Sequence, residues 1–190
     1  MRSIVFIIFC TFFASCISFS QEIRRENCKD EICLEVLHFD SVRLNKNVPL
    51  KLSDKDLFAM LGKPDSIVVE EWPCGNYIND YDTVDVYYYG KTRFISSCGT
   101  SLLHILDFED HRFSFCFQNK QIDYNSTKND IAKFFPNAVK ALDEGWELYN
   151  TEGDMKVLMR ETPEYTEGSG WILTFRDGKI LQIELWWGIC

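Results

Sequence analysis

One short stretch of this chain occurs twice, and the repeat constrains the fold more than any other feature. The first copy reads Leu52-Ser-Asp-Lys-Asp-Leu-Phe-Ala-Met-Leu-Gly-Lys-Pro-Asp65, and the second reads Ser126-Thr-Lys-Asn-Asp-Ile-Ala-Lys-Phe-Phe-Pro-Asn137. Thr127 aligns with Ser53, and the acidic and apolar positions that follow align at the same offset. Each copy precedes strand-like segments, so the repeat predicts two tandem helix-plus-sheet modules. Two unrelated short helices with ordinary caps are the alternative.

The first copy carries start and stop signals for a helix. Ser53 is a good N-cap, and the carboxylate of Asp56 can reach back to the cap N–H and suits the positive end of the helix dipole. Gly62 and Pro64 predict the end of the helix. The apolar residues of one face are Leu57, Met60 and Leu61.

The second copy predicts an equivalent helix. Thr127 is the expected N-cap, Asp130 takes the third position, and Pro136 is expected to end the helix. The apolar face consists of Ile131, Phe134 and Phe135. A short helix with a narrow apolar stripe is unstable alone in water, so each helix is expected to lie on a sheet.

Strand patterns follow both helices. They cover residues 33–44, 67–70, 84–89, 102–108, 113–117, 155–160, 171–176 and 181–187. Residues 109–112 are expected to form a hairpin connection, and Asp177-Gly178 is the preferred sequence of a type I′ hairpin. The predicted fold class is α+β: two tandem modules, each a short helix packed on an antiparallel meander sheet, stapled by disulfides.

The start of the chain has the pattern of an export signal. Met1-Arg2 is a short basic region, an apolar run follows, and Ser18-Phe-Ser20 is a small-x-small cleavage site before Gln21. Cleavage before a lipidated Cys16 is the alternative, because residues 13–16 resemble a bacterial lipoprotein processing box; a retained anchor is a third. The expected organisation is a signal peptide (1–20), an arm and lead-in strand (21–47), module one (48–120) and module two (121–190).

Six cysteines remain after either cleavage, and an even number in an exported chain favours disulfides. They are Cys28, Cys33, Cys74, Cys98, Cys116 and Cys190. Of the 15 possible pairings, we predict Cys28–Cys33, Cys74–Cys98 and Cys116–Cys190. No Cys-x2-Cys occurs and no two histidines lie close together, so neither a metal site nor a cofactor is expected.

Two motifs resemble an exported superfamily. Leu61-Gly-Lys-Pro-Asp65 ends the first helix, and Phe175-Arg-Asp-Gly-Lys179 closes the second meander; the second helix retains only Pro136 of the first motif. The superfamily includes the secreted β-lactamase inhibitor proteins, which carry two such modules, and small lipoproteins of the outer-membrane assembly machine, which carry one. The resemblance implies protein-binding modules with an exposed, often concave sheet face. It identifies no binding residue and does not imply β-lactamase as the partner.

No catalytic constellation stands out in the sequence, so an enzyme is not expected. His38, His104 and His111 are expected to be structural, and Glu70-Glu71 point to opposite faces of one strand. The remaining candidates for chemistry are the acidic positions Asp80, Asp82 and Asp85, which lack the Gly and the distal Glu of a calcium loop. A hydrolase with an unrecognised acidic site is the weakest alternative.

Aromatic residues on otherwise polar strand faces are the candidate binding residues. They are Trp186 beside Glu184, and Tyr87 and Tyr89 beside Asp85. The alternative is that residues 33–44 or the other module cover these faces. The net charge of −9 disfavours nucleic acid and anionic lipid as partners. We expect a periplasmic or secreted protein that binds an unknown envelope or extracellular protein, as an inhibitor, immunity or assembly partner. The alternative is a structural envelope lipoprotein that contacts the membrane only through Cys16.

Overall fold

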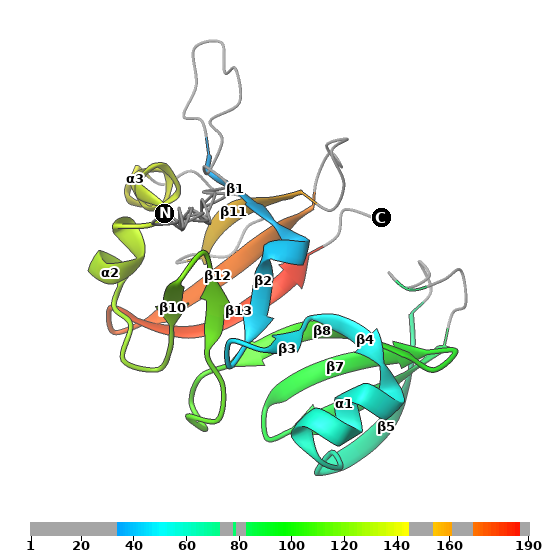
Figure 1. The fold of residues 1–190 in the computed structure, drawn as a ribbon. Coiled ribbons are helices and arrows are strands. Elements are labelled where there is room, and N and C mark those ends of the chain that lie inside the picture. Colours follow the sequence, from blue (N-terminus) through cyan, green and yellow to red (C-terminus); the bar gives the residue numbers. More distant parts are fainter. Residues whose placement is uncertain (1–33, 73–77, 79–82, 145–153, 161–168, 187–190) are drawn as a thin grey trace, which may run out of the picture.

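The computed structural model describes residues 34–72, 78, 83–144, 154–160 and 169–186, and it has an α+β fold (Figure 1). The helices are α1 (Asp54–Leu61), α2 (Lys128–Ala132) and α3 (Pro136–Asp143), with one 3-10 turn, η1 (Phe39–Ser41). The strands are β1 (Val36–His38), β2 (Val42–Leu44), β3 (Val48–Pro49), β4 (Lys51–Ser53), β5 (Ser66–Glu71), β6 (Thr83–Tyr89), β7 (Thr92–Ser97), β8 (Thr100–Asp107), β9 (Phe115–Phe117), β10 (Lys120–Ile122), β11 (Asp154–Arg160), β12 (Gly170–Arg176) and β13 (Lys179–Trp186).

A nine-stranded sheet spans both halves of the sequence. Its order is β1-β11-β12-β13-β8-β7-β6-β5, with β4 also paired to β8. An antiparallel meander is present in each half, β5–β8 and β11–β13, and the pairing of β13 with β8 joins them. The strand β7 of the first meander was not predicted, and β9, which was predicted to continue it, belongs to another sheet. The β1–β11 pair alone is parallel among the described strands. The helix α1 lies on one face at one end of this sheet, and α2 and α3 lie at the other end (Figure 1).

A second sheet of four strands, in the order β10-β9-β2-β3, was not expected. The predicted single strand over 33–44 is wrong, because η1 breaks it into β1 of the large sheet and β2 of the small one. The predicted hairpin at 109–112 is also wrong, since the chain crosses there from β8 to β9 in the other sheet. Local alternation identifies a strand but not the sheet it joins, because tertiary packing makes that choice.

The two helices of the repeat begin in the same way. Asp54 N donates to Gly99 O in the β7–β8 turn at 3.0 Å, and Lys128 N donates to Gly178 O in the β12–β13 turn at 3.0 Å. Both glycines have positive φ, as such tight turns require. Each helix start is therefore fixed to the hairpin turn that closes its own half of the large sheet.

The predicted helix caps are confirmed, with one difference. Asp56 N donates to Ser53 Oγ, but the carboxylate of Asp56 bonds the Ser53 hydroxyl rather than its N–H. Thr127 and Asp130 form the complete reciprocal capping box. Met60 of the first helix is exposed rather than on the buried face.

The prediction that Pro136 ends a helix is wrong, because Pro136 begins α3. Proline suits the first position of a helix, where no N–H partner is needed. The buried carboxylate of Glu35 then accepts from Asn137 N at 2.8 Å and Ala138 N at 3.0 Å. A residue that precedes β1 therefore caps a helix about a hundred positions later, which no local pattern could predict.

The core lies between the two sheets and beneath the helices. Trp171 of β12 is fully buried and contacts Phe115 of β9 and Phe39 of η1, at ring-centroid distances of 5.1 and 6.1 Å. Phe117 stacks on Phe135 at 5.4 Å, which joins the small sheet to the segment between α2 and α3. Phe39 thus packs on the Trp171 face of the sheet, which is opposite the face of Glu184 and Trp186 that residues 33–44 were expected to cover in the alternative interpretation. None of the described helices is long and apolar enough to cross a membrane.

Candidate protein-binding edge

The candidate residues Tyr87 and Tyr89 do not form an exposed aromatic face. Both rings are buried under α1, where Tyr87 contacts Phe58 at 5.2 Å. The Tyr87 hydroxyl donates to Asp54 at 3.0 Å, and the Tyr89 hydroxyl donates to Gly62 O at 2.9 Å. Burial raises the pKa of Tyr89 to about 12. These tyrosines attach the helix to the sheet.

The other two candidates lie on a different strand. Glu184 and Trp186 are half-buried in β13, where Glu184 is paired with Ile172 of β12 and Ile105 of β8. The strands β8 and β7 separate β13 from β6, which carries Tyr87. The structure therefore does not bring the four candidate residues together.

The predicted disulfides mostly lie outside the described residues. Cys28, Cys33, Cys74 and Cys190 are not described, and neither is Cys16. The described part of the chain contains no disulfide: Cys98 is exposed in the β7–β8 turn and Cys116 is buried in β9. Asp80 and Asp82 also lie outside it, and the described residues contain no group of His, Cys, Asp and Glu that could hold a metal ion.

His104 is the described histidine with the most perturbed environment. Burial and the nearby Arg93 lower its pKa to about 4, so the imidazole is uncharged at neutral pH. Its ring packs edge-on against Trp72 at 5.1 Å, and its buried Nδ1 has no hydrogen-bond partner. Glu70 accepts from Trp72 Nε1 and Tyr88 Oη beside it. A base this weak is poorly matched to proton transfer near neutral pH.

His38 and His111 are placed differently. His38 ends β1, and its carbonyl accepts from Ser41 Oγ at 2.6 Å. His111 has φ of 59° and stacks on Tyr124 at 3.9 Å, beside a cavity of about 640 Å³. Among the residues that line this cavity, the two acidic ones, Glu109 and Asp177, balance the charge of the two basic ones, Arg176 and Lys179.

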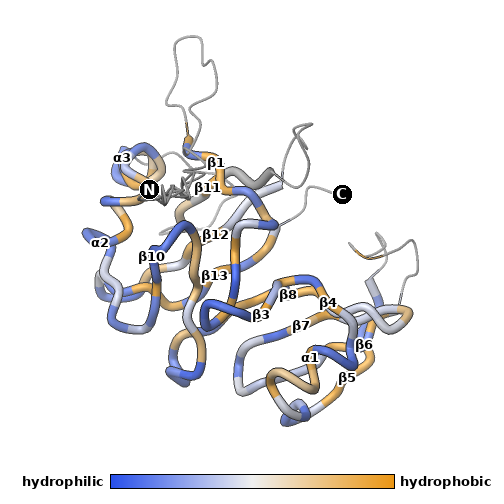
Figure 2. The backbone as a smooth tube through the Cα atoms, viewed as in Figure 1, coloured by the Kyte–Doolittle hydropathy of each residue, from blue (hydrophilic) through white to orange (hydrophobic). Residues whose placement is uncertain are grey.

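The most exposed apolar surface lies on β5, at one end of the large sheet. Ile67, Val68 and Val69 are 55%, 44% and 65% exposed, and only two other large apolar side chains of the described residues are as open, Met60 and Tyr124. The strand pairs with β6 on one side and with no described strand on the other. Figure 1 shows β5 at the margin of the molecule, and Figure 2 shows its apolar character.

The edge strand at the opposite end of the large sheet, β1, is shorter than β5 and its apolar side chains are buried. The edge strand β1 has three residues, and Val36 and Leu37 are 3% and 1% exposed. Short, covered edges are the usual protection against unwanted strand pairing. The strand β5 is longer, with six residues, and none of the described strands pairs with its outer edge.

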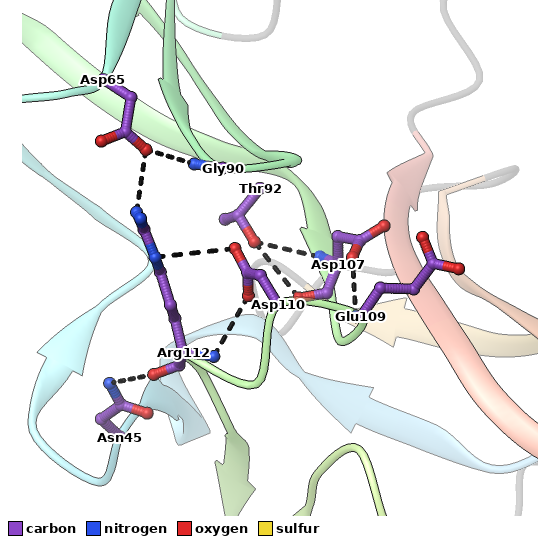
Figure 3. A network of polar contacts seen from close by, with 8 residues as sticks. All are labelled: Asn45, Asp65, Gly90, Thr92, Asp107, Glu109, Asp110 and Arg112. Carbon is purple, nitrogen blue, oxygen red and sulfur yellow. Dashed lines mark hydrogen bonds and ion pairs between the residues drawn. The ribbon is translucent and has the colours of Figure 1, made fainter.

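Polar contacts hold both ends of β5 in place. Asp65, just before the strand, accepts from Gly90 N at 2.6 Å and from Arg112 Nη1 at 2.8 Å (Figure 3). These two hydrogen bonds lower the pKa of Asp65. At the other end, Glu70 accepts from Tyr88 and Trp72, while Glu71 is exposed. The edge is therefore a rigid template with an apolar middle and one acidic end.

The sequence identified β5 as a strand but not as a site. Three successive β-branched residues predict a strand buried on both faces, since a half-exposed strand alternates. The sequence feature that could have indicated an exposed strand is the acidic pair that follows, because Glu70 and Glu71 make a strand with two buried faces implausible. Comparison with protein-family models, with curated proteins and with solved structures finds no match.

Proposed function

We propose that this chain is a non-enzymatic, exported bacterial protein that binds an extended segment of a partner protein along the free edge of β5. The observation that carries the proposal is the exposure of Ile67, Val68 and Val69 on an edge strand whose outer side has no partner among the described strands. The signal-like residues 1–20 support export, with the partner an envelope or extracellular protein.

Strand addition explains why side chains on both faces of β5 are apolar. An added strand would bond to the outward backbone groups of β5, which supplies affinity, while its alternate side chains meet Ile67 and Val69 on one face and Val68 on the other. Because hydrogen bonds hold Asp65 and Glu70, little ordering of β5 is needed on binding.

Charge defines the partner further. Arg112 neutralises Asp65, so Glu71 is the exposed charge at the end of the edge. The whole chain carries a net charge of −9. The partner segment is therefore apolar at alternate positions and carries a basic residue opposite Glu71.

Two tandem modules are the architecture that we propose for this binding protein. The matching helix starts at Asp54 and Lys128, and the symmetric strand order about the β8–β13 pair, support the repeat. In that arrangement β5 and β1 occupy corresponding ends of the sheet, and the buried β1 leaves the edge of module one as the open one.

A photo-crosslinking residue at position 68 of the mature chain tests the proposal in envelope extract. We expect one crosslinked partner, and we expect the Ile67→Lys, Val69→Lys variant to weaken binding of the purified partner at least tenfold. The control is Met60→Lys, Tyr124→Lys, which adds the same charge at exposed apolar positions elsewhere. Equal binding by both variants would exclude the edge. A crosslink between two copies of this chain would make the partner a second copy, which sedimentation would show as a dimer.

A further inference from the structure

The outer face of the small sheet carries a concentration of positive charge that the protein-binding proposal does not use. Residues in register across its four strands form one row: Gln121 of β10, Cys116 of β9, Arg43 of β2 and Pro49 of β3. Their neighbours Val42, Leu44 and Phe115 are buried on the opposite face, against the core. Arg43 therefore lies at the centre of a polar face.

Two adjoining cavities flank Arg43, which lines both. One of about 480 Å³ is lined by Arg43, Lys46 and Lys120 with neutral polar groups, and one of about 340 Å³ is lined by Arg43, Lys51 and Asp40. Asp40 is thus the one acidic residue among their lining residues, against four cations. In a chain with a net charge of −9, this local excess is unusual.

Some cations of the described residues form ion pairs, whereas others, including Lys55, Lys63, Arg93 and Lys179, form none. Six described Lys and Arg side chains elsewhere form ion pairs, namely Lys91, Arg112, Lys128, Lys133, Lys140 and Arg176. Arg43, Lys46, Lys51 and Lys120 form none with any described acid. Their charge is available to a ligand.

The guanidinium of Arg43 is held in position without being neutralised. Its Nη1 donates to Asp40 O at 2.7 Å and to Val42 O at 2.6 Å. Backbone carbonyls orient the group but carry no full charge, so the remaining N–H donors can meet an anion in a bidentate way. Lys120 lies apart from this group: it pairs with Phe117, so its side chain leaves the sheet on the face opposite Arg43, where its ammonium lies over the rings of Phe117 and Phe134, at 5.8 and 5.1 Å.

We propose that these cavities form a binding site for a compact ligand with at least two phosphate or carboxylate groups, which bridges Arg43 between Lys51 on one side and Lys46 on the other. A compact ligand fits better than a long polyanion, because the net charge of the chain repels a polymer that extends beyond the basic surface. The site is independent of β5, and either proposal can fail without the other.

Calorimetric titration of the mature chain with tripolyphosphate and with citrate tests the site and separates phosphate from carboxylate. We expect one of them to bind with a submillimolar Kd at moderate salt. The Lys46→Gln, Lys51→Gln variant should weaken that Kd at least tenfold, and Arg43→Gln should do so too. The matched control is Lys55→Gln, Lys63→Gln, which removes the same charge from exposed positions on and after α1 and should change the Kd less than twofold.

Three outcomes would overturn the proposal. They are absence of binding by both probes at 10 mM, an equal loss in the pocket and control variants, and tight binding of heparin that the pocket variants leave unchanged. Circular dichroism establishes that each variant is folded, and Lys46→Gln, Lys51→Gln keeps the test valid if Arg43→Gln does not fold.

Discussion

The hydroxyl of Tyr87 lies 3.0 Å from the carboxylate of Asp54, the first residue of α1. Ser96 and Ser101, both buried, donate to the same carboxylate from β7 and β8. Three hydroxyl groups from three strands therefore converge on an acidic side chain at the positive end of the helix. This contact explains why Tyr87 faces the helix and not a partner.

The Tyr87→Phe variant keeps the ring and removes this hydrogen bond. Because the acceptor is charged, we expect a loss of about 1.5–3 kcal/mol in the free energy of unfolding, measured by urea denaturation. The control is Tyr124→Phe, an exposed ring, with an expected change within about 0.5 kcal/mol. Equal stability of the two variants would show that the Asp54 contact contributes nothing.

Gly90 and Gly99 provide a matched pair of glycines for a test of packing. Both have positive φ, 63° and 78°, so alanine strains the backbone at either position. A Cβ at Gly90 would in addition overlap Asp110 Oδ2 and lie 3.2 Å from Asp110 Cγ. A Cβ at Gly99 would have no atom within 4 Å. We expect Gly99→Ala to cost about 1 kcal/mol, and Gly90→Ala to lower the melting temperature further. The reverse order would contradict the contact.

The buried His104 predicts sensitivity to acid. Its pKa is about 4 in the folded chain and 6.5 in the unfolded chain, so only the unfolded chain gains this proton between those values. Stability should therefore fall as pH drops from about 6.5 to 4, by up to about 3 kcal/mol, and level off below.

The His104→Phe variant separates this effect from the titration of carboxylates. It should be less sensitive to pH in the window from about 6.5 to 4 than the unaltered chain, with the same response below pH 4. Chemical denaturation at half-unit pH steps measures the difference. Identical pH profiles for the two proteins would rule out a buried neutral imidazole at this position.

The capping box of the second helix predicts a modest local effect. Thr127→Ala removes the side-chain acceptor for Asp130 N and keeps the second acceptor, Thr127 O, and we expect a loss of about 1 kcal/mol. Thr127→Ser keeps the hydroxyl and should stay within about 0.5 kcal/mol of the unaltered chain. Hydrogen exchange at Asp130 N should quicken in the alanine variant alone, and equal exchange in both variants would contradict the cap.

Much of the local structure was predictable from residues close in sequence. The caps at Ser53 and Thr127, the strands of both meanders and the type I′ turn at Asp177-Gly178 depend on a few adjacent side chains. The predictions failed where contacts between residues far apart in the sequence determine the structure. Pro136 starts α3 because Glu35 meets its first turn, and residues 36–44 divide between two sheets because Phe39 packs on Trp171.

The candidate site shows the same division. The sequence placed aromatic residues on polar strand faces, but α1 covers Tyr87 and Tyr89 because Asp54 accepts the Tyr87 hydroxyl and Gly62 O accepts that of Tyr89. The exposure of Ile67 and Val69 could not be predicted, since it depends on β5 being the last strand of the sheet.

By itself, the sequence determined the α+β class, the repeated helix starts and the two meanders, because hydrogen bonds and side-chain periodicity over a few residues specify them. Only the tertiary structure decided which strand at the end of the large sheet has no further neighbour among the described strands, which tyrosines lie under a helix, and how Arg43, Lys46 and Lys51 come to line two adjoining cavities. These features depend on contacts between residues far apart in the chain, whose energies exceed any local preference.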